Sequence, residues 1–370
     1  MNILFVSFSS LFFDVTTPGS APLGGSESCV AYLATQLAKT HDVALLANTA
    51  DAVTLRGVRH FHLTDASIRQ LLSGQRFDVI VALNAPSYGP GLRLLSPASR
   101  VVLWNHHAPD QPAIQPLERP EVRQAFDLVV YVSEWQRAAT EARFAGSPRS
   151  QVIGNGLTPS FESMFSDANE LLLAKQWRAA YTSTPFRGLD LLLDVYRDLD
   201  SPPTLEVFSS MSVYRGDDTP FQALYADARS QPAVRYHGSV SQTQLGAAMR
   251  AVSFLSYPCI FPETFCIAAL EAMAAGALVV ATDLGALAST TMGFARLMPL
   301  SPMTREEFLD RYRRLYCDAL REFRADQAQW AERMFAQSRA VNGAATWRHR
   351  AADWLRRLNE LACVPRQRVS

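Results

Sequence analysis

The chain has 370 residues, of which 48% are hydrophobic and 19% are charged, so it can bury more than one core and disorder is not expected. Lysine plus arginine equals aspartate plus glutamate at 35 each, and the absence of a basic excess argues against a nucleic-acid binder. The five cysteines are scattered without a CxxC pair, which argues against a disulfide framework or a zinc site. Reduced cysteines favour the cytoplasm.

The amino-terminal part of the sequence alternates short apolar runs with helical patterns, as a parallel sheet of βαβ units requires. The first apolar run has no basic segment and no cleavage site, so it indicates a strand and not a signal peptide. No apolar run is long enough to span a membrane. Strands are predicted at 2–8, 42–47, 77–82, 99–104 and 127–132, with helices that include Glu27–Lys39 and Glu134–Phe144.

A turn-rich stretch from Gly154 to Pro159 interrupts this series, and a second series of the same kind follows it. From Thr304 onward the pattern indicates one or two long helices with balanced charges, which favours a solvated helix face over a membrane anchor. Peripheral contact with a membrane stays open. Strands are predicted near 177–182, 204–208, 233–237, 252–257 and 277–281, with helices that include Leu189–Leu199, Gln242–Ala251 and Ile267–Ala275.

The predicted fold class is α/β, with two doubly wound Rossmann-like domains that face each other across a cleft. We place the N-terminal domain at 1–156, a linker at 157–172 and the C-terminal domain at 173–340. The remaining residues, 341–370, are predicted to form a helix that packs back toward the N-terminal domain. Ligands of open α/β sheets bind at the carboxyl ends of the strands, so motifs at strand-to-helix junctions are the candidate sites.

The first such motif runs from Gly19 to Glu27, after the first strand, and a helix is predicted to start at about Ser26. Gly24 and Gly25 let the backbone approach a ligand closely, and the free N–H groups of a helix start favour an anion such as a diphosphate. A flexible loop in which Ser26 caps the helix is the structural alternative, and the motif alone does not decide between them.

The second motif, from Trp104 to Asp110, contains His106 and His107 at the end of a predicted strand. A histidine at this position can hydrogen-bond a sugar hydroxyl or handle a proton near neutral pH. Adjacent side chains diverge, so one histidine is expected to face the ligand and the other to be structural. No carboxylate cluster accompanies the pair, which argues against a metal site.

The third motif, from Ser183 to Asp190, lies between the first strand and first helix of the second domain. Its serine and threonine residues are candidate helix caps, and Arg187 can contact two phosphate oxygens in a fork geometry. An arginine at a helix start opposes the helix dipole, which favours a bound anion over a merely exposed arginine.

The fourth motif, from Pro258 to Gly276, follows an apolar strand and opens an apolar helix. Glu263 lies in the loop, and Glu271 lies inside the helix among Ile, Ala, Leu and Met residues. A carboxylate in such surroundings needs a hydrogen-bond partner, and the hydroxyls of a sugar or a ribose supply one. The alternative is a capping Glu263 and a Glu271 at the solvent edge, which the coincidence of spacing and surroundings disfavours.

Over nearly its whole length the chain resembles the GT-B glycosyltransferases of the large retaining family numbered four. The most specific element is the pair of glutamates followed by Ala272-Met273-Ala274-Ala275-Gly276. The resemblance is carried by Gly24-Gly25-Ser26-Glu27, Val132-Ser133-Glu134-Trp135, Ile153-Gly154-Asn155-Gly156, Arg187-Gly188, Pro262-Glu263-Thr264-Phe265 and Leu270 through Gly276.

This resemblance implies that the N-terminal domain lies on the acceptor side and that the C-terminal domain binds the nucleotide sugar. Glu263 would contact the hydroxyls of the donor sugar, Glu271 the ribose and Arg187 the diphosphate. Gly24 and Gly25 would admit the diphosphate from the other domain, with His106 or His107 beside the sugar on the acceptor side. The donor site would also include Thr264, Phe265 and Cys266.

The chain departs from the family pattern at three places. Thr182 or Ser183 stands where the family usually has a second basic residue, and Arg215 is a candidate replacement. Ser289 stands near a position that is often glutamate, and Cys266 stands where glycine is common.

The predicted function is a retaining, metal-independent transfer of a hexose or pentose from a nucleotide-diphosphate sugar to a hydroxyl acceptor, in polysaccharide, glycolipid or glycoconjugate synthesis. The acceptor is a glycan, a lipid-linked sugar, a small molecule or a protein, and no cofactor besides the donor substrate is expected. A GT-B nucleotide-sugar epimerase and a non-catalytic nucleotide-sugar-binding protein are the alternatives. An epimerase would change the sugar without an acceptor, whereas a binding protein would neither transfer nor hydrolyse it.

Overall fold

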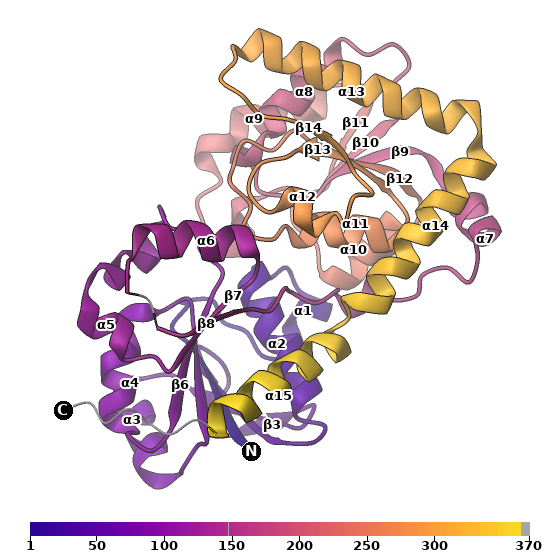
Figure 1. Cartoon of the computed structure of the whole chain (residues 1–370). Coiled ribbons are helices and arrows are strands. Elements are labelled where there is room, and N and C mark those ends of the chain that lie inside the picture. The colour runs from indigo at the N-terminus through magenta and orange to yellow at the C-terminus, as the bar shows by residue number, and fades with distance from the viewer. Residues whose placement is uncertain (147, 364–370) are drawn as a thin grey trace. The chain divides into compact units, whose positions relative to one another are not determined.

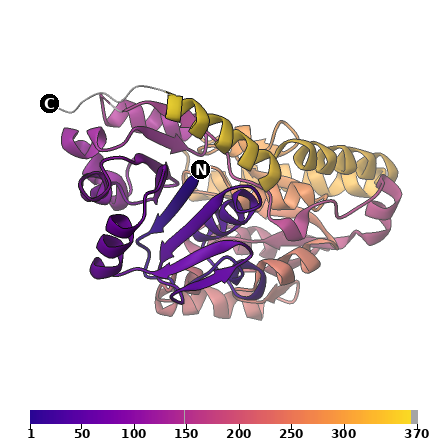
Figure 2. The ribbon, with the colours of Figure 1, turned by 90° about the horizontal axis from the view of Figure 1, so that it is seen from below.

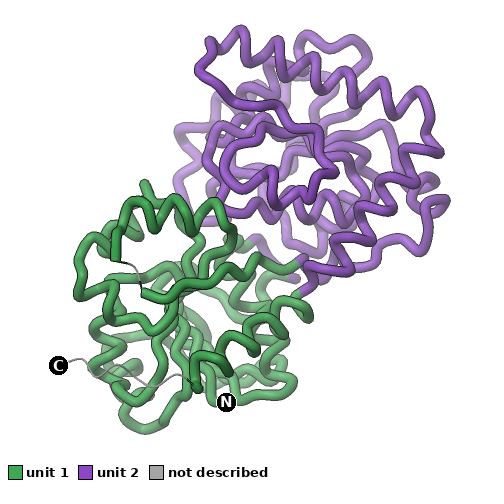
Figure 3. The backbone as a smooth tube through the Cα atoms, viewed as in Figure 1, with its two compact units in different colours: residues 1–18, 23–156, 347–370 green, residues 19–22, 157–346 purple. Residues whose placement is uncertain are grey.

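The structure is a computed structural model that describes residues 1–146 and 148–363 and divides into two compact units (Figures 1 and 3). Unit 1 comprises residues 1–18, 23–156 and the chain from 347 onward, and unit 2 comprises residues 19–22 and 157–346. Each unit is built on one mainly parallel sheet, so the predicted α/β class with two Rossmann-like domains is confirmed.

Unit 1 contains an eight-stranded sheet in the order β3-β4-β2-β1-β5-β6-β7-β8. Its central strands are buried on both faces, which explains their almost continuous apolar sequences. Only the β3–β4 pair is antiparallel among the described strands. The strands are β1 (Asn2–Ser7), β2 (Asp42–Ala47), β3 (Val53–Leu55), β4 (Val58–His62), β5 (Val79–Leu83), β6 (Arg100–Asn105), β7 (Leu128–Tyr131) and β8 (Ser150–Val152).

Helices lie on both sides of this sheet, as Figure 2 shows for the twisted strands of unit 1. On one side α15 packs against α2, where Trp354 of α15 contacts Trp104 of β6 at 5.0 Å between ring centroids. The helices are α1 (Thr17–Ser20), α2 (Gly25–Leu37), α3 (Asp65–Gly74), η1 (Pro86–Tyr88), α4 (Gly89–Leu95), η2 (Pro112–Glu118), α5 (Pro120–Gln124), α6 (Glu134–Arg143) and α15 (Trp347–Cys363).

Unit 2 contains a six-stranded parallel sheet in the order β11-β10-β9-β12-β13-β14. The order places β9 beside β12, although 70 residues of chain separate their ends. This adjacency brings together the loops that leave the carboxyl ends of the two strands. The strands are β9 (Gln176–Tyr181), β10 (Thr204–Val207), β11 (Val234–Tyr236), β12 (Val252–Tyr257), β13 (Leu278–Thr282) and β14 (Arg296–Met298).

Two helical elements of unit 2 precede its first strand, and the others follow its strands. In chain order the helical elements are η3 (Pro159–Phe161), α7 (Ala168–Ala174), η4 (Pro185–Arg187), α8 (Leu189–Arg197), η5 (Met211–Tyr214), η6 (Thr219–Phe221), α9 (Gln222–Ser230), α10 (Gln242–Met249), α11 (Ile267–Ala274), α12 (Leu287–Thr290), α13 (Arg305–Ala325) and α14 (Gln327–Ala344). Among the described residues, no helix is both long enough and apolar enough to cross a membrane.

The chain after Thr304 forms three helices, so the prediction of one or two long helices was wrong. The first break falls at Asp326, whose side chain accepts a hydrogen bond from the N–H of Gln329 and caps α14. The second break falls between α14 and α15, where Ala345 has a non-helical backbone conformation. Both breaks are local capping features that a balanced, Arg-rich and Ala-rich composition does not reveal.

Candidate functional site

Glu263 lies in the loop between β12 and α11 and is 6% exposed. Its Oε1 accepts hydrogen bonds from Arg187 Nη1 at 2.8 Å and from the Tyr257 hydroxyl at 2.5 Å. Cys259 Sγ also lies 4.0 Å from the same oxygen, so these three side chains all meet Glu263 at Oε1. Glu263 is not a helix cap, because Cys266 occupies the N-cap position of α11.

The loop that carries Glu263 is held by the loop that follows β13. The N–H of Ala286 donates to the Glu263 carbonyl at 2.7 Å, and Glu263 forms a parallel β-bridge with Gly285. A Cβ at Gly285 would lie 2.3 Å from the Glu263 carbonyl oxygen, and the φ of Gly285 is +70°. Glycine at 285 therefore allows the backbone contact that fixes Glu263.

Arg187 ends η4, at the junction between β9 and α8. Gly188 follows it with φ +113°, and a Cβ at Gly188 would lie 2.2 Å from the Pro258 carbonyl oxygen, so glycine permits this close contact between loops. The guanidinium lies over Phe261 at 4.5 Å from the ring centroid and over Phe186 at 5.6 Å. Burial lowers the pKa of Arg187, but Glu263 together with Tyr257, Tyr214 and Cys259 raises that pKa well above its usual value.

Two polar atoms at this junction are buried without a hydrogen-bond partner among the described residues, namely Arg187 Nε and the Thr184 hydroxyl oxygen. Both atoms can donate a hydrogen bond. A buried donor without an acceptor is costly, so these two atoms are suited to an anionic ligand. The role of Thr184 was not predicted from the sequence, where serine and threonine residues of this loop were interpreted as helix caps.

That capping prediction was wrong for the described structure. α8 begins after Gly188, which makes no side-chain capping hydrogen bond, and Thr184 precedes η4 without a side-chain cap. Ser26 is likewise not a cap, because α2 begins at Gly25 and its N-cap residue is Gly24. The N-cap residue of both helices is therefore a glycine, Gly24 for α2 and Gly188 for α8, and neither helix start is capped by a side-chain oxygen.

Glu271 lies inside α11 and is 4% exposed, so it does not lie at a solvent edge. The Thr158 hydroxyl donates to its Oε1 at 2.5 Å. Burial raises the pKa of Glu271 to about 7, although the hydrogen bond from Thr158 lowers it. Thr158 was not predicted as a site residue, since only its position in the turn-rich stretch before Pro159 distinguishes it.

The three residues after Glu263 connect it to α11. Thr264 is partly exposed, whereas Phe265 and Cys266 are buried. Cys266 has φ +72°, a left-handed conformation that a glycine adopts without strain. Burial raises the pKa of Cys266 well above its usual value, so its thiol is neutral.

In unit 1 the predicted glycine-rich helix start is linked to the histidine loop by one side chain, that of Asn84, which follows β5. Its Nδ2 donates to the Ser26 hydroxyl at 3.0 Å, and its Oδ1 accepts from the backbone N–H of His106 at 2.7 Å. Asn84 has φ +53°, so the backbone is held in a left-handed conformation at this point. Asn84 was not predicted as a site residue.

His106 and His107 are both partly buried at the end of β6. His106 Nε2 lies 3.1 Å from Asn155 Oδ1, and His107 Nδ1 lies 2.5 Å from Gln111 Oε1. Burial lowers the pKa of His106 to about 3, and burial also lowers the pKa of His107. Both imidazoles are therefore neutral at pH 7, which suits them to hydrogen bonding and not to carrying a positive charge.

Glu27 completes the predicted Gly-Gly-Ser-Glu motif and is buried in the first turn of α2. Burial raises its pKa, while hydrogen bonds to its own backbone and to Ser9 lower it. Gly24 and Gly25 form the start of α2. Across residues 1–146 and 148–363, no group of three or more histidine, cysteine or acidic side chains could hold a metal ion.

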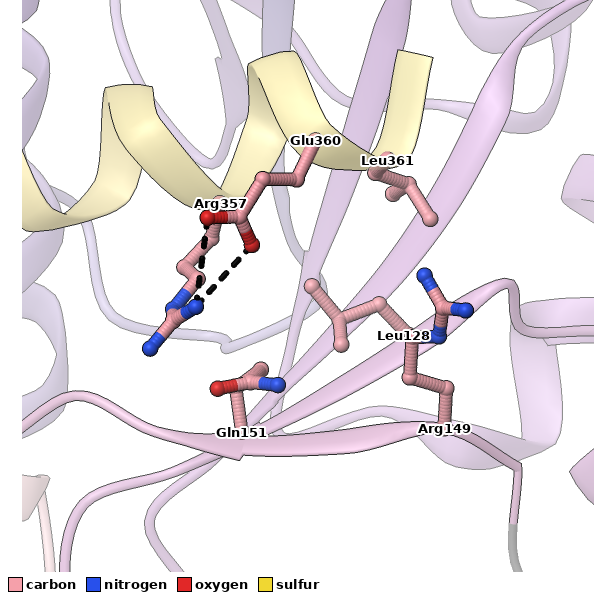
Figure 4. A pocket seen from close by; sticks show the side chains of 6 residues that line it. All are labelled: Leu128, Arg149, Gln151, Arg357, Glu360 and Leu361. Atoms are coloured by element: carbon pink, nitrogen blue, oxygen red, sulfur yellow. Dashed lines mark hydrogen bonds and ion pairs between the residues drawn. The ribbon is translucent and has the colours of Figure 1, made fainter. Parts of the chain in front are cut away.

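A small pocket lies elsewhere in unit 1, between α15 and the start of β7 and β8 (Figure 4). Arg357 and Glu360 of α15 form an ion pair on one side of it, with Arg149 and Gln151 on the other. Because it lies at the amino ends of the strands, this pocket is separate from the predicted ligand edge of the sheet.

The architecture of two Rossmann-like units is that of the GT-B fold, and solved structures share it along almost the full chain. A glycosyltransferase from Rickettsia africae aligns with a TM-score of 0.73 at 13% identity, covering 98% of this chain and 99% of its own. Sucrose-phosphate synthase from Thermosynechococcus elongatus gives 0.70 at 16%, covering 98% and 99%. HepE from Anabaena in complex with UDP gives 0.67 at 18%, covering 97% and 100%.

Two family models match successive parts of the sequence, Glycosyltransferase Family 4 at residues 23–161 and Glycosyl transferases group 1 at residues 180–318. The chain therefore belongs to the group 1 glycosyltransferases of GT-B fold. No curated protein matches it in sequence.

Proposed function

We infer that the chain transfers a hexose or pentose from a nucleotide-diphosphate sugar to a hydroxyl acceptor, with retention of the anomeric configuration and without a metal ion. The reaction would belong to polysaccharide, glycolipid or glycoconjugate synthesis in the cytoplasm. The observation that carries this proposal is the junction between β9 and α8, where Arg187 Nε and the Thr184 hydroxyl have no partner among the described residues and lie beside the Arg187–Glu263 ion pair.

The diphosphate of the donor would bind at the junction between β9 and α8. In the described part of the chain, Arg187 Nε and the Thr184 hydroxyl are donors without acceptors, and phosphate oxygens would satisfy both. The Arg187 side chain would also stabilise the negative charge that develops on the leaving diphosphate. HepE was solved in complexes with UDP and with UDP-glucose, which supports a nucleotide-diphosphate sugar as the class of donor.

The sugar and the ribose would be held by the two glutamates. Oε2 of Glu263 can accept a sugar hydroxyl while Oε1 keeps its bonds to Arg187 and Tyr257. Glu271 lies in the second turn of α11, eight residues after Glu263, and would accept hydroxyls of the ribose. In unit 1, His106 or His107 would hydrogen-bond the reacting sugar or the acceptor as a neutral imidazole.

A thermal-shift screen against a panel of nucleotide sugars tests the donor class first. The unfolding temperature should rise with one base and sugar and not with free sugars. Product analysis with that donor then separates the possible activities. An epimerised donor in the absence of acceptor, or binding without transfer and without hydrolysis, would contradict the proposed transfer. Retention is checked by NMR of the new anomeric linkage, and an inverted centre would contradict it.

A further inference from the structure

Two exposed aromatic side chains lie at the carboxyl edge of the unit 1 sheet. Tyr88 is 48% exposed and follows β5, and Phe12 is 53% exposed and follows β1. β1 and β5 are adjacent parallel strands whose ends are in register at Ser7 and Leu83. The two rings therefore come from neighbouring loops at the edge where ligands of such sheets bind.

The ring of Tyr88 is held in a fixed position. It stacks on Phe8 with 3.5 Å between ring centroids and 9° between planes, and Phe8 packs against the hydrophobic core. The Tyr88 N–H bonds the Ala85 carbonyl at 3.2 Å, and the next residue, Gly89, lies so close to Phe126 that a Cβ there would be 2.5 Å away. Phe8 thus covers one face of the Tyr88 ring, and the exposed surface of Tyr88 lies on the other parts of that ring.

The backbone around Phe12 is also fixed. Its neighbours Leu11 and Phe13 are buried, and the N–H of Phe13 donates to the Asn48 carbonyl at 3.0 Å. The chain thus directs Phe12 outward between two buried anchors. The Tyr88 ring, which is exposed and held against Phe8, is a pre-organised binding surface, since little conformational entropy is lost when a ligand covers it.

Polar residues lie on the same edge of the sheet as these rings. Asn84 lies four residues before Tyr88, Ser87 is exposed beside it, and His107 follows the adjacent strand β6. A flat aromatic face combined with hydroxyl, amide and imidazole groups suits a sugar ring, whose C–H face is apolar and whose rim consists of hydroxyls. A hydrocarbon chain would gain nothing from the polar groups.

We propose that Tyr88, with Phe12, forms the acceptor-binding surface and that the acceptor presents a sugar ring that stacks on Tyr88. This inference rests on the proposed function and names the class of its acceptor. The stack on Phe8 positions the ring before the acceptor arrives, so the acceptor meets a formed surface.

The test is saturation-transfer-difference NMR with three probes, the methyl glycosides of glucose, galactose and mannose, each added to the whole protein. Ring C–H protons of at least one glycoside should receive saturation. Tyr88→Ala should weaken that binding by about three- to tenfold, the range expected for loss of an aromatic contact. Tyr88→Phe should retain most of it. Leu94→Ala is the matched control, because Leu94 is 81% exposed at the far end of α4 and should leave the signals unchanged.

Saturation signals that are equal in the parent protein and Tyr88→Ala would overturn the inference, as would the absence of signals from all three probes. Binding to phosphatidylcholine–phosphatidylglycerol vesicles that is lost in both Tyr88→Ala and Leu94→Ala, without sugar signals, would overturn it in favour of a membrane surface. Nucleotide-sugar binding is measured by thermal shift in the same samples. If the parent protein binds no nucleotide sugar, the proposed function is contradicted. Unchanged nucleotide-sugar binding in Tyr88→Ala shows that the variant is folded.

Discussion

The guanidinium of Arg187 and the carboxylate of Glu263 form a largely buried ion pair, with 2.8 Å between Nη1 and Oε1, although they lie 76 positions apart in the sequence. The side chains are 20% and 7% exposed. The proposed diphosphate ligand and the proposed sugar ligand would therefore contact two groups that already contact each other. Loss of Arg187 should therefore disturb the proposed contact to the sugar as well as the proposed contact to the diphosphate.

Arg187→Ala should weaken donor binding by roughly tenfold or more, because a charge-assisted hydrogen bond contributes about 1.5–3 kcal/mol. Arg187→Lys should recover only part of the affinity, since an ammonium group cannot contact two oxygens in a fork. Calorimetry at fixed salt measures both, with Arg215→Ala as the comparison. If Arg187→Ala binds the donor like the parent protein, the diphosphate lies elsewhere and the Ser183–Gly188 loop has another role.

The same substitution should also reduce stability, because Glu263 would be left as a buried charge without its partner. Removing one partner of a buried ion pair lowers the free energy of unfolding by about 3–5 kcal/mol. Urea unfolding therefore accompanies the affinity measurement, and donor binding is compared only at temperatures where each variant is folded.

Glu263→Gln should remove most of the transfer activity while leaving nucleotide binding, at a cost of roughly 10²–10³ in rate. Glu271→Ala should mainly raise the nucleotide dissociation constant, because the ribose does not react. Single-turnover transfer and calorimetry with the nucleoside diphosphate measure the two effects. Small and equal effects of the two substitutions would show that both carboxylates are structural.

The fold could be predicted from the sequence where burial determines composition. The strands β2 and β12 have the predicted bounds, because strands covered on both faces are continuous apolar runs. The edge strands β8 and β14 were not predicted. Each strand has only three residues. β8 includes Ser150 and Gln151, and β14 includes Arg296, so neither forms an apolar run.

The candidate site could be predicted only as separate loops. Sequence motifs identified Arg187 and Glu263, but their contact follows from the placement of β9 beside β12 in the sheet order, which no local pattern specifies. Asn84 and Thr158 were not predicted for a similar reason. Each acts through a partner distant in sequence, Ser26 in one case and Glu271 in the other.

Transfer should persist when EDTA is added, and neither magnesium nor manganese should be required. The physical reason is that Arg187, the Thr184 hydroxyl and backbone N–H groups at helix starts can neutralise the diphosphate. Initial rates with EDTA, and after addition of each metal, measure this. Complete loss of transfer with EDTA that manganese or magnesium restores would refute the prediction.

Asn84→Gly should lower transfer by about tenfold while leaving nucleotide binding unchanged. Glycine keeps the left-handed backbone at φ +53° but removes the side chain that joins Ser26 to the His106 backbone. Asn84→Asp keeps an acceptor for the His106 N–H and should lose less. Arg56→Gly is the control, since Arg56 also has a positive φ, +49°, in an exposed turn. Equal rates for Asn84→Gly and the parent protein would show that the link has no role in transfer.

The protonation of Glu271 should make stability and donor affinity depend on pH in opposite directions. Its pKa is about 7 in the folded protein against an ordinary value of 4.5, so the folded state binds its proton more tightly than the unfolded state. The resulting contribution to stability is present below pH 4.5 and is lost as pH rises to about 7. At about 1.4 kcal/mol per pH unit, the loss is about 3 kcal/mol.

Donor affinity should rise over the same interval, because the carboxylate accepts ribose hydroxyls better than the neutral acid does. With the pKa at about 7, the ionised fraction, and hence the affinity, should be roughly tenfold lower at pH 6 than at pH 8. Calorimetry with a nucleotide sugar measures this, since its diphosphate carries no proton that titrates in this range. Urea unfolding across the same pH values measures stability. Glu271→Gln cannot ionise, so this variant should lose both dependences together. An affinity that changes equally with pH in Glu271→Gln and in the parent protein would mean that another group titrates, and that the Glu271 carboxylate does not hold the ribose.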